Sequence, residues 1–147
     1  LRGNDMSKYN NKKVEVLGYN FDSKIESEYF LYLLKRQELG EIACFEMQVP
    51  FTLLEPYELL GRNVRGINYI ADFVVYYHDR PREVIDIKGM VLSDFKLKKK
   101  LFESKYKVPL QLITYSKIDG GWISLDQLAK ARKERKKLKE IKKSNKI

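Results

Sequence analysis

Cysteine and histidine are almost absent from this sequence, and their scarcity excludes several kinds of site. The 147 residues include one cysteine and one histidine. One cysteine, Cys44, cannot form an internal disulfide or a cysteine-rich zinc site, and it suits a reducing compartment. One histidine, His78, argues against a histidine-ligated metal or a Ser-His catalytic pair, and we expect it to be exposed in a turn. The chemistry that remains is that of carboxylates.

Long apolar runs are also absent. No stretch approaches the roughly 20 residues of a membrane-spanning helix, and the amino terminus lacks the apolar segment of a signal peptide. We therefore expect a cytoplasmic protein that does not associate with membranes. Residues 1–5 precede Met6 and are interpreted as a remnant of cloning. Hydrophobic residues make up 44% and charged residues 33%, which predicts a globular domain with its own core.

Positive charge is concentrated at the carboxyl terminus. The formal net charge is +9, and the stretch from Lys130 to Ile147 holds ten Lys or Arg against two Glu, a local charge of +8. We therefore divide the chain into a domain over residues 6–128 and a basic helix or tail over 129–147. A solvated helical end is the commonest use of such a stretch. Contact with a nucleic-acid backbone is the alternative, and its candidate residues are Lys133, Lys136 and Lys137.

The residues from Tyr69 to Gly89 predict an antiparallel hairpin with charges inside it. Two runs rich in β-branched and aromatic residues flank a polar turn. Asp86 and Lys88 alternate on one face of the second strand, and the hairpin can bring Asp72 of the first strand beside them. Two acids and a lysine in one small area are what a metal-dependent phosphodiester-cleaving site needs. The carboxylates hold a hard divalent cation, and the lysine steadies the phosphate or the attacking water.

The alternative is that Asp86 and Lys88 form an ordinary surface pair and that Asp72 lies near a sheet edge. An isolated Asp-x-Lys would favour this alternative, because the tripeptide carries little information. Here, however, the neighbouring residues are apolar on both faces of the strands. Strands buried on both sides rarely hold charge without a partner or a metal. We therefore favour the site.

A helix is predicted over residues 21–39, with Gly40 ending it. Ser23 is a good N-cap, and Glu26 three residues later completes a capping-box pattern. At about 100° per residue, Glu26 lies on the apolar side of the helix, whereas Glu28 points to solvent. Two roles are open to Glu26, closing the capping box or joining the metal site on the sheet. They do not exclude each other.

Residues 42–54 predict a strand, because apolar and polar residues alternate along it. Pro50 marks an edge or a bend of the sheet. Gln48 lies on the polar side, where it could orient phosphate or water. An ordinary surface glutamine is the alternative.

Residues 55–68 lose this periodicity and predict a flexible loop. Its two arginines, Arg62 and Arg65, suit contact with a nucleic-acid backbone without being diagnostic of it.

A second helix over residues 94–106, capped by Ser93, follows the hairpin. Its basic ridge is either a solvated face or a set of phosphate contacts near the candidate site. The lysines of this ridge are Lys96, Lys99 and Lys100.

The remaining elements follow from the same patterns. The second helix can place four apolar residues in the core, namely Phe95, Leu101, Phe102 and Tyr106. A strand is predicted over 108–115 and a turn over 119–121. Ser124 begins the final basic helix.

In order along the chain, these motifs resemble the PD-(D/E)xK nuclease superfamily. The residues that carry the resemblance are Glu26 on the first helix, Asp72 on one strand and Asp86-x-Lys88 on the next. The usual core of that superfamily is α-β-β-β-α-β, which agrees with the predicted order over residues 21–115. The resemblance therefore implies an α/β fold with a restriction-endonuclease-like core, a mixed central sheet and flanking helices.

A narrower resemblance is to small phage and prophage proteins of this superfamily that are similar to Holliday-junction resolvases. It is carried by Phe-Asp-Ser-Lys-x-Glu, the strand that contains Gln48, Tyr-Ile-Ala-Asp-Phe, Asp-Ile-Lys-Gly and Lys-Leu-Lys-Lys-Lys-Leu-Phe-Glu. Ala71 stands where the superfamily name has proline. That position varies within the superfamily and contacts no metal through its side chain.

The resemblance implies a role for each residue of the site. Asp72 and Asp86 would be the principal Mg²⁺ ligands, with the Ile87 carbonyl as a further ligand and Mn²⁺ as a substitute ion. Glu26 would contribute directly or through water, and Lys88 would position or activate the attacking hydroxide.

The implied function is a Mg²⁺-dependent DNA endonuclease acting on branched DNA in a bacterial host cell. A resolvase cuts two symmetric strands, so we expect a two-fold homodimer. The alternatives are a non-catalytic DNA-binding module of the same fold, or a restriction-like or nicking nuclease of other specificity.

Overall fold

The computed structural model describes residues 12–89 and 91–146. The interpretation of residues 1–5 falls outside this part of the chain. In chain order the elements are β1 (Val14–Val16), β2 (Tyr19–Phe21), α1 (Lys24–Glu38), β3 (Cys44–Leu54), β4 (Tyr57–Leu59), β5 (Arg62–Val64), β6 (Ile67–Tyr76), β7 (Glu83–Ile87), α2 (Ser93–Tyr106), β8 (Leu110–Ser116), the 3₁₀ turn η1 (Lys117–Asp119), β9 (Gly121–Ser124) and α3 (Leu125–Ser144).

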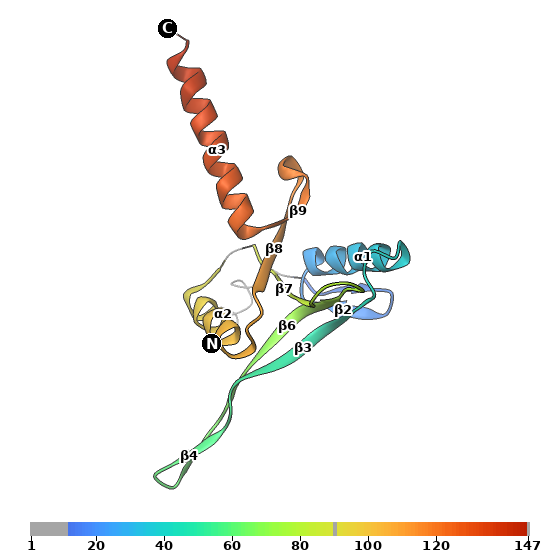
Figure 1. Cartoon of the computed structure of the whole chain (residues 1–147), viewed down its shortest axis with the longest axis vertical. Coiled ribbons are helices and arrows are strands. Elements are labelled where there is room, and N and C mark those ends of the chain that lie inside the picture. Colours follow the sequence, from blue (N-terminus) through green and yellow to red (C-terminus); the bar gives the residue numbers. More distant parts are fainter. Residues whose placement is uncertain (1–11, 90, 147) are drawn as a thin grey trace.

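The centre of the molecule is a five-stranded sheet in the order β3-β6-β7-β8-β9. β7 and β8 run parallel, and the other neighbours are antiparallel. One core cluster joins α1 to Ile85 and Ile87 of β7, and a second joins α2 to Val84 of the same strand. Because alternate residues of a strand face opposite sides, the two helices cover opposite faces (Figure 1). The prediction of an α/β fold with a mixed sheet and flanking helices is confirmed.

Helix α1 forms as its sequence pattern predicts. The Ser23 hydroxyl accepts a hydrogen bond from the Glu26 backbone N–H at 3.3 Å, which caps the helix. Its apolar stripe, including Tyr29 and Leu33, is buried against the sheet. The helix ends before Gly40, whose φ of +77° suits a glycine.

Along the paired strands β3 and β6, the face of the sheet to which odd-numbered residues point changes at Gln48 and Asp72. On β3, Met47 packs in the α1 layer and Val49 in the α2 layer, although both are odd-numbered positions. The residue between them, Gln48, has a φ of +53°, outside the extended range of a strand. Met47 pairs with Phe73 and Val49 with Ala71, so Gln48 lies across from Asp72. Since β3 is an edge strand of the five-stranded sheet, the prediction that Pro50 marks an edge or a bend is confirmed.

The prediction of a flexible loop over residues 55–68 is wrong. These residues form the hairpin β4–β5 and the start of β6, and the hairpin projects from one end of the molecule (Figure 1). Its turn is Leu60-Gly61, with φ of +51° and +77°. Two positive φ values are typical of a type I′ turn, for which Asn-Gly is the usual signal and Leu-Gly is not. Gly66 lies at the base of the hairpin, where an added Cβ would collide with the Leu54 carbonyl oxygen.

Three smaller predictions need correction. Helix α2 begins at Ser93 itself, with Leu92 at the N-cap and no side-chain cap bond. Leu101 is 38% exposed, while Phe95 and Phe102 enter the core as expected. Gly121 does not belong to a turn but starts the strand β9, which is antiparallel to β8. The pattern of β9 is short and half-buried, so alternation did not reveal it.

Helix α3 begins where predicted and extends away from the sheet. The Ser124 hydroxyl accepts from the Gln127 N–H at 3.2 Å, and Leu128 is buried at the base of the helix. Arg135 forms an ion pair with Asp119 of η1, which holds the first half of the helix against the body. The remainder stands free at the end of the long axis opposite the β4–β5 hairpin (Figure 1). Among the described residues, no helix combines the length and apolar character needed to span a bilayer.

Candidate functional site

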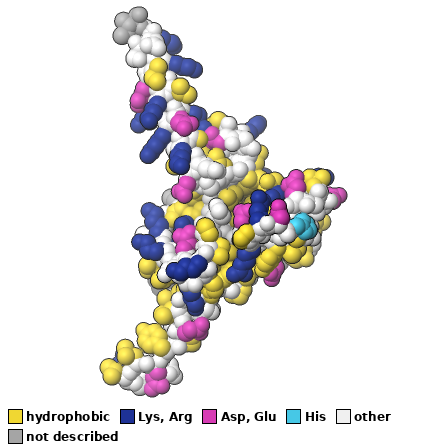
Figure 2. Space-filling model, in the orientation of Figure 1, with side chains coloured by type: hydrophobic (Ala, Val, Ile, Leu, Met, Phe, Trp, Pro, Cys, Tyr) yellow, Lys and Arg dark blue, Asp and Glu magenta, His cyan; other side chains and the backbone are white. Residues whose placement is uncertain are grey.

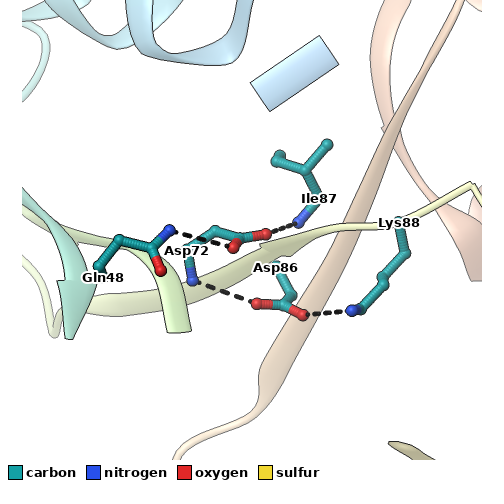
Figure 3. A network of polar contacts seen from close by, with 5 residues as sticks. All are labelled: Gln48, Asp72, Asp86, Ile87 and Lys88. Carbon is teal, nitrogen blue, oxygen red and sulfur yellow. Dashed lines mark hydrogen bonds and ion pairs between the residues drawn. The ribbon is translucent and has the colours of Figure 1, made fainter. Parts of the chain in front are cut away.

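The acids of the predicted hairpin accept hydrogen bonds from backbone N–H groups where β6 and β7 separate (Figure 3). The paired residues of these strands run from Val75–Glu83 to Phe73–Ile85. Beyond them, the Asp72 N–H donates to Asp86 Oδ1 at 3.1 Å, and the Ile87 N–H donates to Asp72 Oδ2 at 2.9 Å. Where the strands diverge, the two carboxylates therefore accept hydrogen bonds from backbone N–H groups that no longer pair between β6 and β7. The structure brings Asp72 and Asp86 together as the sequence predicts.

Lys88 completes the predicted triad. Its Nζ lies 3.1 Å from Asp86 Oδ2 and 4.4 Å from the centre of the Phe95 ring. The Asp86 side chain is 3% exposed and that of Lys88 32%, so the lysine reaches from a buried acid toward solvent. The alternative of an ordinary surface pair is wrong for Asp86. An ammonium at the edge of a buried carboxylate can contact an anion that approaches from outside.

Glu26 faces these acids from helix α1. Burial raises the pKa of Glu26, and the negative charges of Asp22 and Asp86 raise it further. Glu26 likewise contributes to the raised pKa of Asp72. Only the half of the capping box that uses the Ser23 hydroxyl is present as a hydrogen bond among the described residues. Glu26 therefore adds negative charge to the site, whereas Glu28 lies exposed 3.9 Å from Lys24.

The electrostatics of the site suit a divalent cation. Burial raises the pKa of Asp72 to about 7, and the nearby charges of Asp86 and Glu26 act in the same direction. Buried like charges are unfavourable unless a cation offsets them, and carboxylate oxygens are the ligands that Mg²⁺ prefers. Over residues 12–89 and 91–146, no three His, Cys, Asp or Glu side chains converge into a ready metal-binding group. The donor set thus fits a cation held mainly by Asp72 and Asp86, with backbone oxygen, water or Glu26 completing its shell.

A family model matches most of the chain, over residues 6–125, and its description reads "Protein of unknown function (DUF1064)". The chain belongs to the DUF1064 family. The match includes all four residues of the site and ends at the first residue of α3. A search of curated proteins found no match to this DUF1064 chain.

In this DUF1064 chain, Gln48 lies beside the acids. Its Nε2 is 3.5 Å from Asp72 Oδ1, a long contact, and the side chain is otherwise exposed. The positive φ of Gln48 is a backbone strain of the kind that persists where the surroundings enforce it. The alternation of β3 predicted a polar position here but not this conformation, which depends on the pairing with β6.

Tyr69 is a residue of the site that the sequence analysis did not select. Its ring packs between Phe95 and Phe102, and its hydroxyl is buried without a hydrogen-bond partner among the described residues. Burial raises the pKa of Tyr69, and the charge of Asp86 raises it further, so the hydroxyl stays protonated beside that acid. The Tyr69 hydroxyl therefore lies close to Asp86, the acid that also contacts Lys88. In the sequence, Tyr69 is one of several aromatic residues of a strand, and nothing distinguishes it from a core residue.

The candidate DNA contacts of the second helix differ from one another. Lys96 and Lys100 are exposed, whereas Lys99 lies 2.9 Å from Glu103. Glu103 also accepts from the Leu110 N–H at 2.9 Å, so Lys99 and Glu103 join α2 to β8. Lys99 is therefore already paired, and the free ridge consists of Lys96 and Lys100.

The other candidate contacts lie at the two projecting ends of the molecule. Arg62 and Arg65 are exposed on and beside β5. The three lysines of α3 are exposed as well and share one side of that helix, because they are three and four residues apart. Lysine and arginine side chains follow α3 along its length (Figure 2). A cavity of about 290 Å³ is lined by both Gly89, next to Lys88, and Arg132 of α3, so the base of this helix adjoins the candidate site.

Proposed function

We propose that this protein is a Mg²⁺-dependent DNA endonuclease of the PD-(D/E)xK type, with a restriction-endonuclease-like core, that cuts branched DNA. The observation that carries the proposal is the pair of buried Asp86 and half-buried Asp72, with Lys88 on Asp86 and Glu26 facing both. Packing alone gives no reason to gather three like charges, one buried and two half-buried, around one lysine. A divalent cation and a phosphate do give one.

The residues divide the work of hydrolysis between them. Water attacks phosphorus as a new O–P bond forms, and the bond from phosphorus to the 3′ oxygen breaks, which leaves a 5′-phosphate and a 3′-hydroxyl. Bound Mg²⁺ would polarise the phosphate and offset the charge that grows on it. Asp72 and Asp86 would hold that ion, together with the Ile87 carbonyl. Lys88 would contact the attacking oxygen or the phosphate, and Gln48 and Glu26 would orient water.

The basic residues support a nucleic-acid substrate. The stretch from Lys130 to Ile147 carries a charge of +8, and its helix adjoins the site through Arg132. Phosphate contacts supply most of the affinity of such proteins for DNA. We take the substrate to be branched DNA and the protein to act as a homodimer, with Mn²⁺ able to replace Mg²⁺.

A non-catalytic DNA-binding module is the second candidate, and one observation favours it. Asp72 and Asp86 each accept a backbone N–H, which is a structural use that requires no metal. A module that binds DNA without cutting it would keep these bonds and the basic helix. It would gain nothing, however, from a third carboxylate near the same point, because carboxylates repel phosphate.

The deciding experiment measures cleavage of a labelled four-way junction, flap, linear duplex and single strand, in Mg²⁺ or EDTA. The Asp86→Asn variant is compared with Asp79→Asn, the same change in the exposed turn of the same hairpin. We expect cutting that needs both Mg²⁺ and Asp86 and that is unaffected at Asp79. Tight binding of DNA without cutting, in Mg²⁺ or Mn²⁺, would favour the binding module instead.

A further inference from the structure

The β4–β5 hairpin places apolar side chains in solvent at one end of the molecule (Figure 2). Leu60 at its tip is 96% exposed, Leu59 57% and Tyr57 46%. Isolated two-stranded hairpins are at best marginally stable in water, and this one has three-residue strands. Packing in the core therefore does not explain this hairpin, and binding to another molecule would.

The tip also carries a conformational cost. Leu60 has a φ of +51°, and an L-residue adopts this left-handed conformation only at a cost in free energy. Asparagine or glycine would occupy this position of the turn more cheaply. Leucine gains nothing there from packing, because the side chain is almost wholly exposed. An apolar side chain in a strained and exposed position is a reason to look for a ligand.

The hairpin is continuous with the candidate site. β3 and β6 lead from the hairpin to Gln48 and Asp72, which lie across from each other in the same ribbon. Leu60 precedes Asp72 by twelve residues, so at about 3.3 Å per residue the tip lies at most about 40 Å from the site. At about 3.4 Å per base pair, that reach is no more than about 12 base pairs.

The surroundings of the tip favour DNA over a second copy of the chain. Arg62, paired with Leu59 across the hairpin, and Arg65 beyond it are both exposed and complement phosphate. Glu58 offsets part of their positive charge. The distinguishing feature of the hairpin is therefore its apolar tip and not a strong positive charge.

We propose that the β4–β5 hairpin is a wedge that inserts Leu60 against the exposed base pair at a DNA branch point, while Arg62 and Arg65 contact the flanking phosphates. This inference rests on the proposed function and specifies its substrate as DNA with a discontinuity in base stacking. Apolar side chains, leucine among them, are used by DNA-bending proteins to separate stacked bases. The wedge selects DNA in which stacking is already interrupted, because opening intact duplex costs additional free energy.

The test replaces Leu60 without disturbing the turn. Leu60→Asn creates Asn-Gly, the favoured type I′ sequence, and so removes the wedge while keeping the hairpin. Leu60→Phe retains an apolar tip. The matched control is Leu17→Asn, because Leu17-Gly18 forms the same turn, with φ of +52° and +83°, in the β1–β2 hairpin. Affinity for a four-way junction and for linear duplex is measured in EDTA, with 2-aminopurine at the branch point to report unstacking.

We expect Leu60→Asn to lower the preference for junction over duplex about tenfold, as for the loss of one base-contacting side chain, and to abolish the 2-aminopurine signal. Leu60→Phe and Leu17→Asn should behave like the wild-type protein. Unchanged preference in Leu60→Asn would overturn the wedge, and so would a dimer that this substitution converts to monomer in sedimentation.

Cleavage in Mg²⁺, measured in parallel, separates this inference from the proposed function. Wild-type cutting with no effect of Leu60→Asn on junction preference would overturn the wedge and leave the nuclease standing. A Leu60-dependent unstacking signal without cutting in any metal would support the wedge and overturn the nuclease.

Discussion

The two ends of the β3–β6 ribbon reverse the usual placement of side chains. At the sheet end, Asp72 is packed near Asp86, whose side chain is 3% exposed. At the hairpin end, Leu60 is 96% exposed. Charge is buried at one end and apolar surface is exposed at the other, and both arrangements cost free energy in the isolated protein.

Along this single pair of strands, the residues that pack the core are distinct from the residues at the two ends, whose placement packing does not explain. Between the two ends, Phe51, Leu53 and Ala71 are buried and supply ordinary packing. A cost that packing does not explain is expected where a protein binds or reacts, and substitutions that remove it commonly raise stability and lower activity.

The largest effect is expected at the buried end, from Lys88→Ala. Removing the ammonium beside Asp86 should lower cleavage by about 10²- to 10³-fold, the range for losing one group that stabilises transition-state charge. Junction binding should change little, because one contact among many is lost. The measurement is single-turnover cleavage with Kd in parallel, and Lys24→Ala on α1 is the control. Equal loss of cleavage and binding would make Lys88 a binding or folding residue.

The second effect concerns binding that neither end of the ribbon supplies. Replacing Lys133, Lys136 and Lys137 of α3 together by Gln should weaken binding to junction and duplex alike. The dependence of log K on log salt should become shallower by about 0.9 for each lysine that contacts a phosphate. Lys24→Gln with Lys35→Gln on α1 is the control. An unchanged slope would mean that this face of α3 does not contact DNA.

Most of the sheet end could be predicted from the sequence, because its signals are local. Alternation on β7 put Asp86 and Lys88 on one face, and helix periodicity turned Glu26 inward and Glu28 outward. The N–H bonds that Asp86 accepts from Asp72 and Asp72 accepts from Ile87 could not be predicted. They depend on where β6 and β7 separate, which only the three-dimensional pairing determines.

The hairpin end could not be predicted, for a related reason. Leu60-Gly61 is a weak turn signal, and its flanking strands are too short to show alternation. The Tyr69 hydroxyl and the pairing of Lys99 with Glu103 were missed as well, since both depend on neighbours brought close by folding. A ridge of lysines in the sequence does not reveal which of them is already paired.

The third effect is on the stability of the buried end. Because the pKa of Asp72 is raised to about 7 in the folded protein, the metal-free fold loses stability as the pH rises through that value. Asp72→Asn removes this charge, so above pH 7 it should raise the free energy of unfolding by about 1–3 kcal/mol. The difference should shrink as the pH falls from about 7 toward 4, where Asp72 of the wild-type protein becomes protonated.

Thermal unfolding in EDTA from pH 5 to pH 9 measures this effect, with Asp79→Asn as the control. Adding Mg²⁺ should stabilise the wild-type protein and leave Asp72→Asn unchanged, because a bound ion stabilises only the fold that holds it. A metal-free Asp72→Asn that is less stable than wild type at pH 8 would show that the N–H bond from Ile87 outweighs the repulsion.

The smallest effect distinguishes the two hairpins that share a Leu-Gly turn. Leu60→Asn should raise the free energy of unfolding by about 0.5–1 kcal/mol, since asparagine adopts a positive φ more readily than leucine. Leu17→Asn should raise it less, because Leu17 borders an apolar hollow with Phe30 and Met47 and asparagine would place a polar group there. For a chain of this size, about 1 kcal/mol corresponds to a shift of roughly 2–4 °C in Tm. If both Leu60→Asn and Leu17→Asn raise stability but only Leu60→Asn lowers junction preference, then both leucines strain their turns and only Leu60 contributes to DNA binding. A loss of stability at Leu60 would instead mean that the leucine supports the hairpin itself.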